Sequence, residues 1–177
     1  MSERRERRAR TMSDPELIAP DYQLLSFLLG RETYALDVLS VQGVERMTEI
    51  TSIPRMPDFV EGVIDLRGQI VPIIDLRKRF GLPASAPDKA TRIIIIEFER
   101  KQVGLIVDSV YEVIRIDRKD VKKMTAIGSL PIDSDFLIGV AKHKDKLVIV
   151  LNIEKVFTAE EKSTLGIRFG GQQKNGE

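Results

Sequence analysis

Asp65, Asp75, Asp108 and the single histidine, His143, are the residues whose types and positions first suggest chemistry. Paired carboxylates can serve as general acid and base, and a histidine oriented by a carboxylate can activate a nucleophile. Asp75 and Asp108, however, each follow an apolar run, where an aspartate normally caps a helix or begins a turn. His143 lies among lysines at the tip of a charged hairpin, a setting typical of a solvated histidine. We therefore interpret these residues as structural or solvated, and not as catalytic.

Other kinds of site lack their residues altogether. The 177-residue chain contains no cysteine, which excludes disulfides, thiolate metal sites and a cysteine nucleophile. It contains no glycine-rich phosphate loop, no HExxH pair, no GxSxG elbow and no calcium-loop pattern. The sequence predicts a protein that is not an enzyme and that has no cofactor and no metal site.

The net charge and the apolar runs of the chain indicate no overall attraction to nucleic acid or to a membrane. Lys and Arg number 28 against 27 Asp and Glu, a net charge of +1. The longest apolar runs are far too short to span a bilayer, and no apolar run follows the N-terminal arginines as in a secretory signal. We expect a cytoplasmic protein without direct membrane insertion.

Residues 1–20 form an arginine-rich leader that two proline residues interrupt. One interpretation is a contact with nucleic acid or acidic lipid, which would make the chain a small-barrel nucleic-acid-binding module. The other is a solvated, disordered leader, as charge runs without apolar residues usually are. We expect the second, because the ten aromatic residues are thinly spread and mostly lie in apolar contexts, so that no nucleic-acid partner is indicated.

The chain is organised around residues 59–81, which predict a hairpin. An apolar strand at 63–66 leads into a tight reversal, where Gly68 can take a positive φ. A second strand at 70–74 returns, and Pro72 within it lacks an N–H for a ladder. We therefore expect this second strand to lie at a sheet edge or to carry a bulge.

The same stretch recurs later in the chain, which indicates an internal duplication. Phe59 matches Phe136 and Gly62 matches Gly139, each 77 residues apart. An upstream block repeats at an offset of 69, pairing Val41 with Val110. We predict that the duplicated glycines need backbone room. The residues that we assign to structural turns are Gly62, Gly68 and Gly139.

Each half of the chain predicts about five short strands, the pattern of a small barrel or sandwich. Asp75 should cap a short helical turn. Residues 38–44, with a valine every third position, suit a short helical turn or a twisted extended segment, and 44–50 a strand. The halves, about 22–83 and 91–157, are marginal in size, so they should pack together, with a possible exchange of strands. Residues 158–177 predict one helical turn at 159–165 and a disordered tail.

Three segments resemble the bacterial chemotaxis coupling proteins of the CheW family. They are GVIDLRGQIVPIIDLRKRFG at 62–81, YALDVLSVQGV at 34–44 and VGLIVDSVYEVIRI at 103–116. The likeness covers roughly residues 22–157. It implies that residues 21–157 form a single domain of all-β class, in which two SH3-like five-stranded β-barrels with short helical turns pack together.

The resemblance also implies a function. Members of this family are non-catalytic adaptors that link the cytoplasmic tips of methyl-accepting chemoreceptors to the regulatory domain of the chemotaxis histidine kinase. Barrel-to-barrel contacts build their signalling arrays. We accordingly expect these two partners, and a chain that is monomeric in isolation.

The receptor site follows from the same resemblance. In the family, receptor tips bind in an apolar groove between the barrels, and the arginine of the LRG turn contributes. One departure concerns Gly43, where many family members carry an acidic residue. The residues of this chain at the matching positions are Val41, Gln42, Val44, Arg67, Val110 and Val113.

Overall fold

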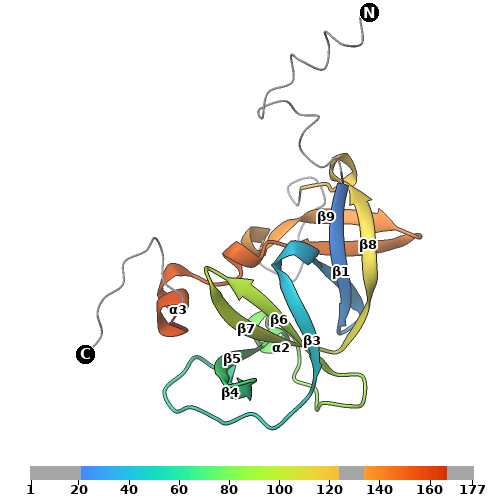
Figure 1. Cartoon of the computed structure of the whole chain (residues 1–177). Helices are drawn as coiled ribbons and strands as arrows, with labels where there is room; N and C mark the ends of the chain where they lie inside the picture. Colours follow the sequence, from blue (N-terminus) through green and yellow to red (C-terminus); the bar gives the residue numbers. More distant parts are fainter. Residues whose placement is uncertain (1–20, 124–133, 167–177) are drawn as a thin grey trace, which may run out of the picture.

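The computed structural model describes residues 21–123 and 134–166, which fold into ten strands with short helical turns between them (Figure 1). The leader at 1–20, the end of the C-terminal tail and residues 124–133 lie outside the described ranges. The helical turn predicted at 159–165 is present as α3 (Ala159–Thr164), whereas the disorder predicted for the leader and for the end of the tail remains a prediction.

The strands form two five-stranded sheets, which we call barrel one and barrel two. In spatial order, barrel one contains β3 (Val41–Arg46), β6 (Arg92–Phe98), β7 (Lys101–Val107), β5 (Gln69–Asp75) and β4 (Val60–Leu66). Barrel two contains β8 (Ser109–Asp117), β1 (Asp21–Leu29), β2 (Glu32–Asp37), β10 (Lys146–Leu151) and β9 (Leu137–His143).

Short helical elements connect the strands. They are η2 (Val38–Ser40), α2 (Leu76–Arg79), η3 (Arg118–Asp120), η5 (Ser134–Phe136), η6 (Ile153–Lys155) and α3 (Ala159–Thr164). The all-β class, the five strands in each barrel and the short helical turns agree with the sequence predictions.

The two barrels have the same strand order because the chain is duplicated. Every strand of barrel one has its duplicate at the same place in barrel two, and β5 runs parallel to β7 as β10 runs parallel to β2. The sequence halves are nevertheless interleaved. The β1–β2 hairpin belongs to barrel two and the β6–β7 hairpin to barrel one, so each half of the sequence contributes strands to both barrels (Figure 1).

Alternation along the exchanged strands gives the molecule three apolar clusters. In β6, Ile94 and Ile96 point into a cluster shared by both barrels, whereas Ile93 and Ile95 point into the interior of barrel one. In β1, Phe27 belongs to the shared cluster, whereas Leu24 on the other face belongs to the cluster inside barrel two. A strand with two buried faces explains why 93–96 is an unbroken run of isoleucine.

The predicted 63–74 hairpin is present as β4 and β5, and one of its details differs from expectation. Gly68 has φ +85°, as its turn requires. Pro72 does not lie in an edge strand, because β5 has β4 on one side and β7 on the other. The ladder to β7 begins only at Ile73, so Pro72 precedes it and its missing N–H interrupts no bond there.

The segment after β2 also differs from its prediction. Both alternatives for residues 38–44 occur in succession, since η2 is followed directly by β3. The strand expected at 44–50 is β3, which begins three residues earlier, at Val41, and ends at Arg46. A β-bulge between Val41 and Gly43 disturbs the strand alternation in this segment and explains the error.

Gly62 and Gly139 lie within strands β4 and β9, so their assignment to turns is wrong. The predicted need for backbone room is present at both, because another segment of the chain passes close to each glycine. A Cβ on Gly62 would lie 2.0 Å from the Thr51 carbonyl oxygen, and φ there is +145°. A Cβ on Gly139 would lie 2.4 Å from the Lys122 carbonyl oxygen. In barrel one, the chain after the edge strand β3 pairs through Thr51 with β4, and in barrel two the chain after the edge strand β8 pairs through Lys122 with β9. Each pairing brings the two edges of a sheet closer together.

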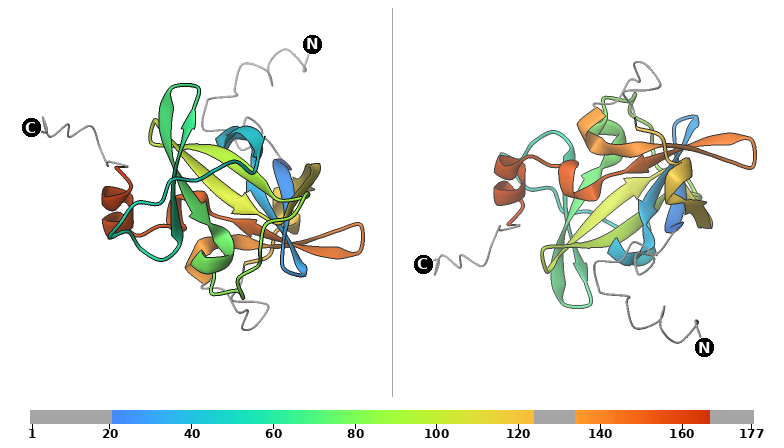
Figure 2. Two further views of the ribbon diagram at one scale, coloured as in Figure 1. Left: turned by 90° about the horizontal axis from the view of Figure 1, so that it is seen from below. Right: turned by 90° about the horizontal axis from the view of Figure 1, so that it is seen from above.

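Two features project on opposite sides of the molecule. The β9–β10 hairpin extends away from barrel two, and α3 covers the far side of the fold (Figure 2). The segment before α3 returns from barrel two to the shared cluster, where Val156 and Phe157 are buried.

Candidate protein-binding surface

The aspartates that first suggested chemistry stabilise turns. The Asp75 carboxylate accepts hydrogen bonds from the Arg77 and Lys78 backbone N–H groups at the start of α2. Burial raises the pKa of Asp75 above its usual value, although these hydrogen bonds act in the opposite direction. The Asp65 carboxylate accepts from the Gly68 N–H at 2.8 Å within the β4–β5 turn. These hydrogen bonds give both carboxylates a structural role.

Asp108 is held in a partly buried ion pair. Its carboxylate accepts from the Arg77 guanidinium at 2.7 Å (Nε) and 2.5 Å (Nη2), and from the Gly30 N–H at 2.8 Å. Burial raises the pKa of the Asp108 carboxyl, but the hydrogen bonds from Arg77 and Gly30 outweigh burial and hold the pKa below its usual value. A carboxylate kept ionised by a bidentate arginine serves as an anchor.

Ranges 21–123 and 134–166 contain neither metal-binding groups nor membrane-spanning helices. No group of three or more His, Asp or Glu side chains there could hold a metal ion. Over the same ranges, no helix is long and apolar enough to cross a membrane.

The four valines named above lie on equivalent edge strands and on one face. In barrel one, Val41 pairs with Ile96 and Val44 with Ile94. In barrel two, their duplicates Val110 and Val113 pair with Phe27 and Leu25. All four strand partners belong to the shared cluster. Since directly paired residues lie on the same face of a sheet, the valines face the seam between the barrels.

The valines divide into an inner and an outer pair. Val41 and Val110 are half-buried and pack against the shared cluster. Val44 and Val113 are exposed, at 41% and 53%. The seam therefore has an apolar floor and an apolar rim on both edge strands, which suits an apolar side chain from a protein partner.

Gln42 and Arg67 both lie on barrel one, and each contacts a carboxylate there. Gln42 donates to a Glu97 carboxylate oxygen at 2.8 Å and accepts from Gln102 at 2.5 Å. Arg67 has φ +52°, and its side chain is 87% exposed with Nη2 3.9 Å from Glu45 Oε1. Glu45 thus supplies a carboxylate two residues after Gly43. Gly43 is the position where many family members carry an acidic residue.

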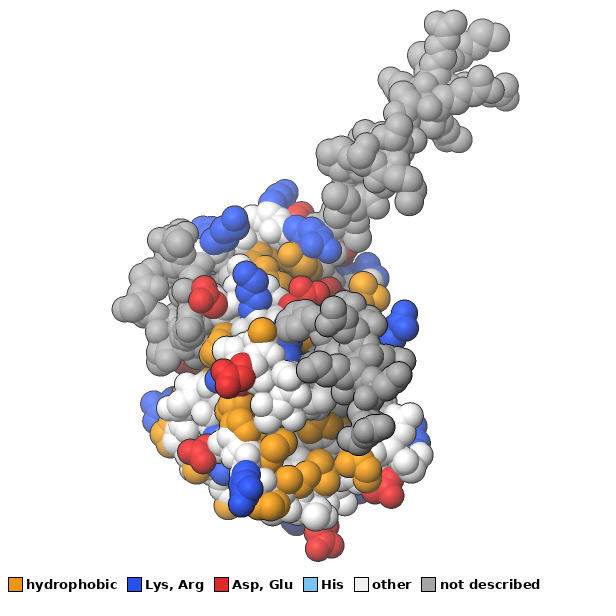
Figure 3. All heavy atoms as spheres, turned by 90° about the vertical axis from the view of Figure 1, so that its left-hand side faces the viewer, with side chains coloured by type: hydrophobic (Ala, Val, Ile, Leu, Met, Phe, Trp, Pro, Cys, Tyr) orange, Lys and Arg blue, Asp and Glu red, His pale blue; other side chains and the backbone are white. Residues whose placement is uncertain are grey.

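Sequence reasoning missed other exposed apolar residues. Ile70 and Leu147 are duplicates at the hairpin tips and are 67% and 59% exposed, and Leu39 on η2 is 90% exposed. The duplication itself could have identified the first pair, because both follow a hairpin turn by two or three residues. Figure 3 shows further hydrophobic side chains gathered toward the lower end of the face that carries β4 and β5.

Comparisons with known proteins identify the family of the chain. The CheW-like domain family matches residues 23–161. A chemotaxis protein CheW from Klebsiella aerogenes is 34% identical over 139 residues, which cover 78% of this chain and 83% of that protein. A CheW from Treponema pallidum is 32% identical over 148 residues, covering 79% of this chain and 84% of that protein.

A solved structure is also similar. The crystal structure of the scaffolding protein TtCheW from Thermoanaerobacter tengcongensis superposes with a TM-score of 0.72 at 40% sequence identity, covering 80% of this chain and 95% of that one. The family match spans both barrels and all four valines, so the chain belongs to the CheW-like domain family.

Proposed function

We propose that this protein is a non-catalytic chemotaxis adaptor that couples methyl-accepting chemoreceptors to the chemotaxis histidine kinase. The observation that carries the proposal is the 40% identity with a scaffolding protein across 95% of that protein's length. The carboxylates that could have suggested catalysis serve as caps and ion-pair anchors instead. The adaptor works in the cytoplasm, where receptor tips and kinase meet, and needs no cofactor.

The receptor tip occupies the seam between the barrels. An amphipathic helix can place its apolar face on the half-buried Val41 and Val110 while its edges contact the exposed Val44 and Val113. Gln42 and Arg67 provide polar contacts at the side of barrel one. The kinase binds at a different end of the fold, so that both partners are held at once.

Glutamate substitutions at the seam test this assignment. Val44→Glu and Val113→Glu each place a charge at an exposed position that the receptor would bury, at a cost of several kcal/mol. We expect each to reduce binding of a receptor tip fragment by at least about a hundredfold, while circular dichroism and kinase binding stay unchanged. Loss of kinase binding with receptor binding intact would reverse the assignment.

The inner pair serves as the matched comparison. Val110 packs against the shared cluster, so Val110→Glu is expected to lower the melting temperature as well as receptor binding. Arg67→Ala should weaken receptor binding only a few-fold, because an exposed ion pair contributes about 0–1 kcal/mol. Equal effects of Val44→Glu and Val110→Glu on stability would contradict the division into an inner and an outer pair.

A further inference from the structure

The end of barrel two at the β9–β10 hairpin is hollow. A cavity of about 500 Å³ opens there to the surface. Its apolar lining comes from Ile114 and Val148, and Tyr111 stands at its edge with 54% of its surface exposed. The other lining residues are polar: Ser26, Thr33, Glu112, His143, Lys144 and Lys146.

The duplicated barrel shows why this end is open. Ser26 in β1 corresponds to Ile95 in β6, at the offset of 69 residues. Ile95 is buried in the interior of barrel one with Ile93 and Val71. The shorter Ser26 side chain instead turns to the backbone, donating to the Glu112 carbonyl oxygen at 2.8 Å. The volume that isoleucine fills in barrel one is thus left free in barrel two.

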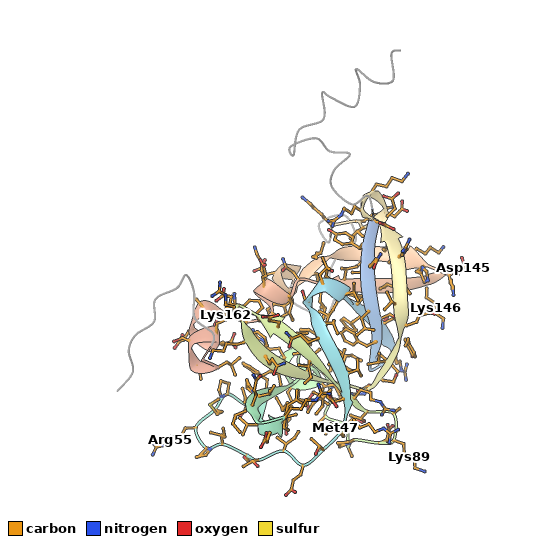
Figure 4. The ribbon with its side chains drawn as sticks, in the orientation of Figure 1. Met47, Arg55, Lys89, Asp145, Lys146 and Lys162 are labelled. Atoms are coloured by element: carbon orange, nitrogen blue, oxygen red, sulfur yellow. The ribbon has the colours of Figure 1, made fainter. Side chains whose placement is uncertain are left out.

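The rim of the cavity is predominantly basic. Lys144 and Lys146 lie on its wall beside His143. Lys144 Nζ is 3.7 Å from Glu112 Oε1, and both side chains are well exposed, so this pair contributes little and can rearrange. Within the described ranges, no ion pair to Lys146 occurs. Figure 4 shows Lys146 at the outer end of the hairpin, where a partner can reach it.

We propose that this open end of barrel two is a second docking site, which binds an acidic segment of a partner protein that carries one apolar anchor side chain. The anchor enters the cavity over Ile114 and Val148, with Tyr111 against its side. Carboxylates of the same segment meet Lys144 and Lys146. An exposed tyrosine beside an open pocket with an apolar floor, and lysines at the rim, form a surface that an acidic segment with one apolar anchor can fit.

Charge favours a foreign partner over a second copy of this chain. A symmetric contact between two copies would bring the hairpin that carries Lys144 and Lys146 against its own equivalent. The like charges would repel one another, whereas an acidic segment is attracted from a distance. The cavity floor, Ile114 and Val148, belongs to the interior of barrel two, whereas Val110 of the seam packs against the shared cluster.

The test is an NMR titration of the isotope-labelled full-length protein with a short synthetic peptide in which glutamates flank one central phenylalanine. We expect amide shifts to change at the cavity residues Ser26, Tyr111 and Val148. The same peptide with lysine in place of each glutamate should cause no such changes. Absence of shifts at these residues with the acidic peptide, or equal binding of the basic one, would overturn the proposal.

Three variants complete the test. The double variant Lys144→Glu and Lys146→Glu should weaken binding of the acidic peptide by about tenfold or more, because two attractions become repulsions. Lys89→Glu, the control, makes the same type of charge change at an exposed linker position and should leave binding unchanged. Ser26→Ile, checked for folding by circular dichroism, should remove binding by filling the cavity. Unaltered binding in both cavity variants would refute the site.

Discussion

At the scale of single residues, Asp108 connects three segments that are distant in sequence. It lies between β7 of barrel one and β8 of barrel two, and its N–H donates to the Leu28 carbonyl oxygen at 3.0 Å. Its carboxylate binds Arg77 on α2 and the N–H of Gly30 in the β1–β2 turn. The passage of the chain from β7 of barrel one to β8 of barrel two is therefore held by the side chain and the N–H of Asp108.

Asp108→Asn should destabilise the protein in a pH-dependent way. Loss of the charge weakens the hydrogen bonds from Arg77 and Gly30, at a cost of about 1–3 kcal/mol at neutral pH. Since folding lowers the pKa of this carboxyl, its stabilisation is fully present above the unfolded-state value of about 3.9 and is lost as the pH falls through the folded-state pKa.

Urea unfolding of the wild type and the variant measures this difference. The gap in unfolding free energy should be largest near neutral pH and should shrink below about pH 4. Asp145→Asn, at the exposed hairpin tip, is the control and should change stability by less than about 0.5 kcal/mol. A gap of the same size at pH 7 and pH 3 would show that the charge of Asp108 is not what stabilises the fold.

At the scale of elements, each barrel has its bulge and its narrowed edge at the same duplicated place. The register of β4 against β5 shifts between Val60 and Gly62, and that of β9 against β10 shifts where Gly139 pairs. The chains that cross at Thr51 and Lys122 pass directly over these glycines. The glycines therefore permit the edges of each sheet to approach one another.

Alanine at these positions should destabilise both barrels, and Gly62→Ala should cost more than Gly139→Ala. Gly62 combines a backbone clash with a positive φ, for which we expect a loss of about 3 kcal/mol or more. Gly139 has the clash without the positive φ, so about 1–3 kcal/mol is expected.

Gly43→Ala is the matched control, because a Cβ there would meet no atom within 4 Å. Denaturant unfolding should place it within about 0.5 kcal/mol of the wild type. If Gly139→Ala were as stable as Gly43→Ala, the crossing chain would have to move freely, and the close approach would not be needed.

The sequence could predict these elements and could not predict how they pair. Duplicated glycines, strand alternation and the Asp75 cap are local or repeated patterns, which a single sequence displays. The exchange of hairpins is different, because β1–β2 and β6–β7 have the same apolar pattern and would satisfy either barrel. Similarly, the spacing of Val41 and Val44 implies a shared face only once the bulge between them is known. The open end of barrel two depends on one small residue, Ser26, whose effect becomes visible only against Ile95.

At the scale of the whole molecule, the two barrels are joined by the shared cluster and by one arginine at its edge. Arg79 on α2 lies between the duplicated Phe59 and Phe136, with its guanidinium carbon 4.8 Å from each ring centroid. The same side chain donates to the Val156 carbonyl oxygen at 2.8 Å and to Glu161 of α3 at 2.9 Å. It thus connects both barrels with the C-terminal helix.

Glu161 fixes α3 through a second contact as well. It forms a capping box with Thr158 at the start of the helix, so its carboxylate is shared between the cap and Arg79. The six residues of α3 have only Lys162 buried. So short a helix is not stable by itself, and its position depends on these charged contacts.

Arg79→Leu should therefore loosen the attachment of α3 and weaken the joint between the barrels. The variant loses both cation–π contacts and leaves the Val156 carbonyl without its donor, for a combined cost of about 2–4 kcal/mol. Unfolding should remain a single transition, because the shared cluster stays intact. Hydrogen exchange in 159–164 should accelerate far more than in β6 or β7.

Arg79→Lys, which keeps a charge near the rings and loses the planar fork, should fall between the wild type and Arg79→Leu. Arg31→Leu, in the exposed β1–β2 turn, should match the wild type. If Arg79→Leu accelerated exchange equally in α3 and in the strands, the arginine would support the fold as a whole and would not specifically hold the C-terminal helix against the two barrels.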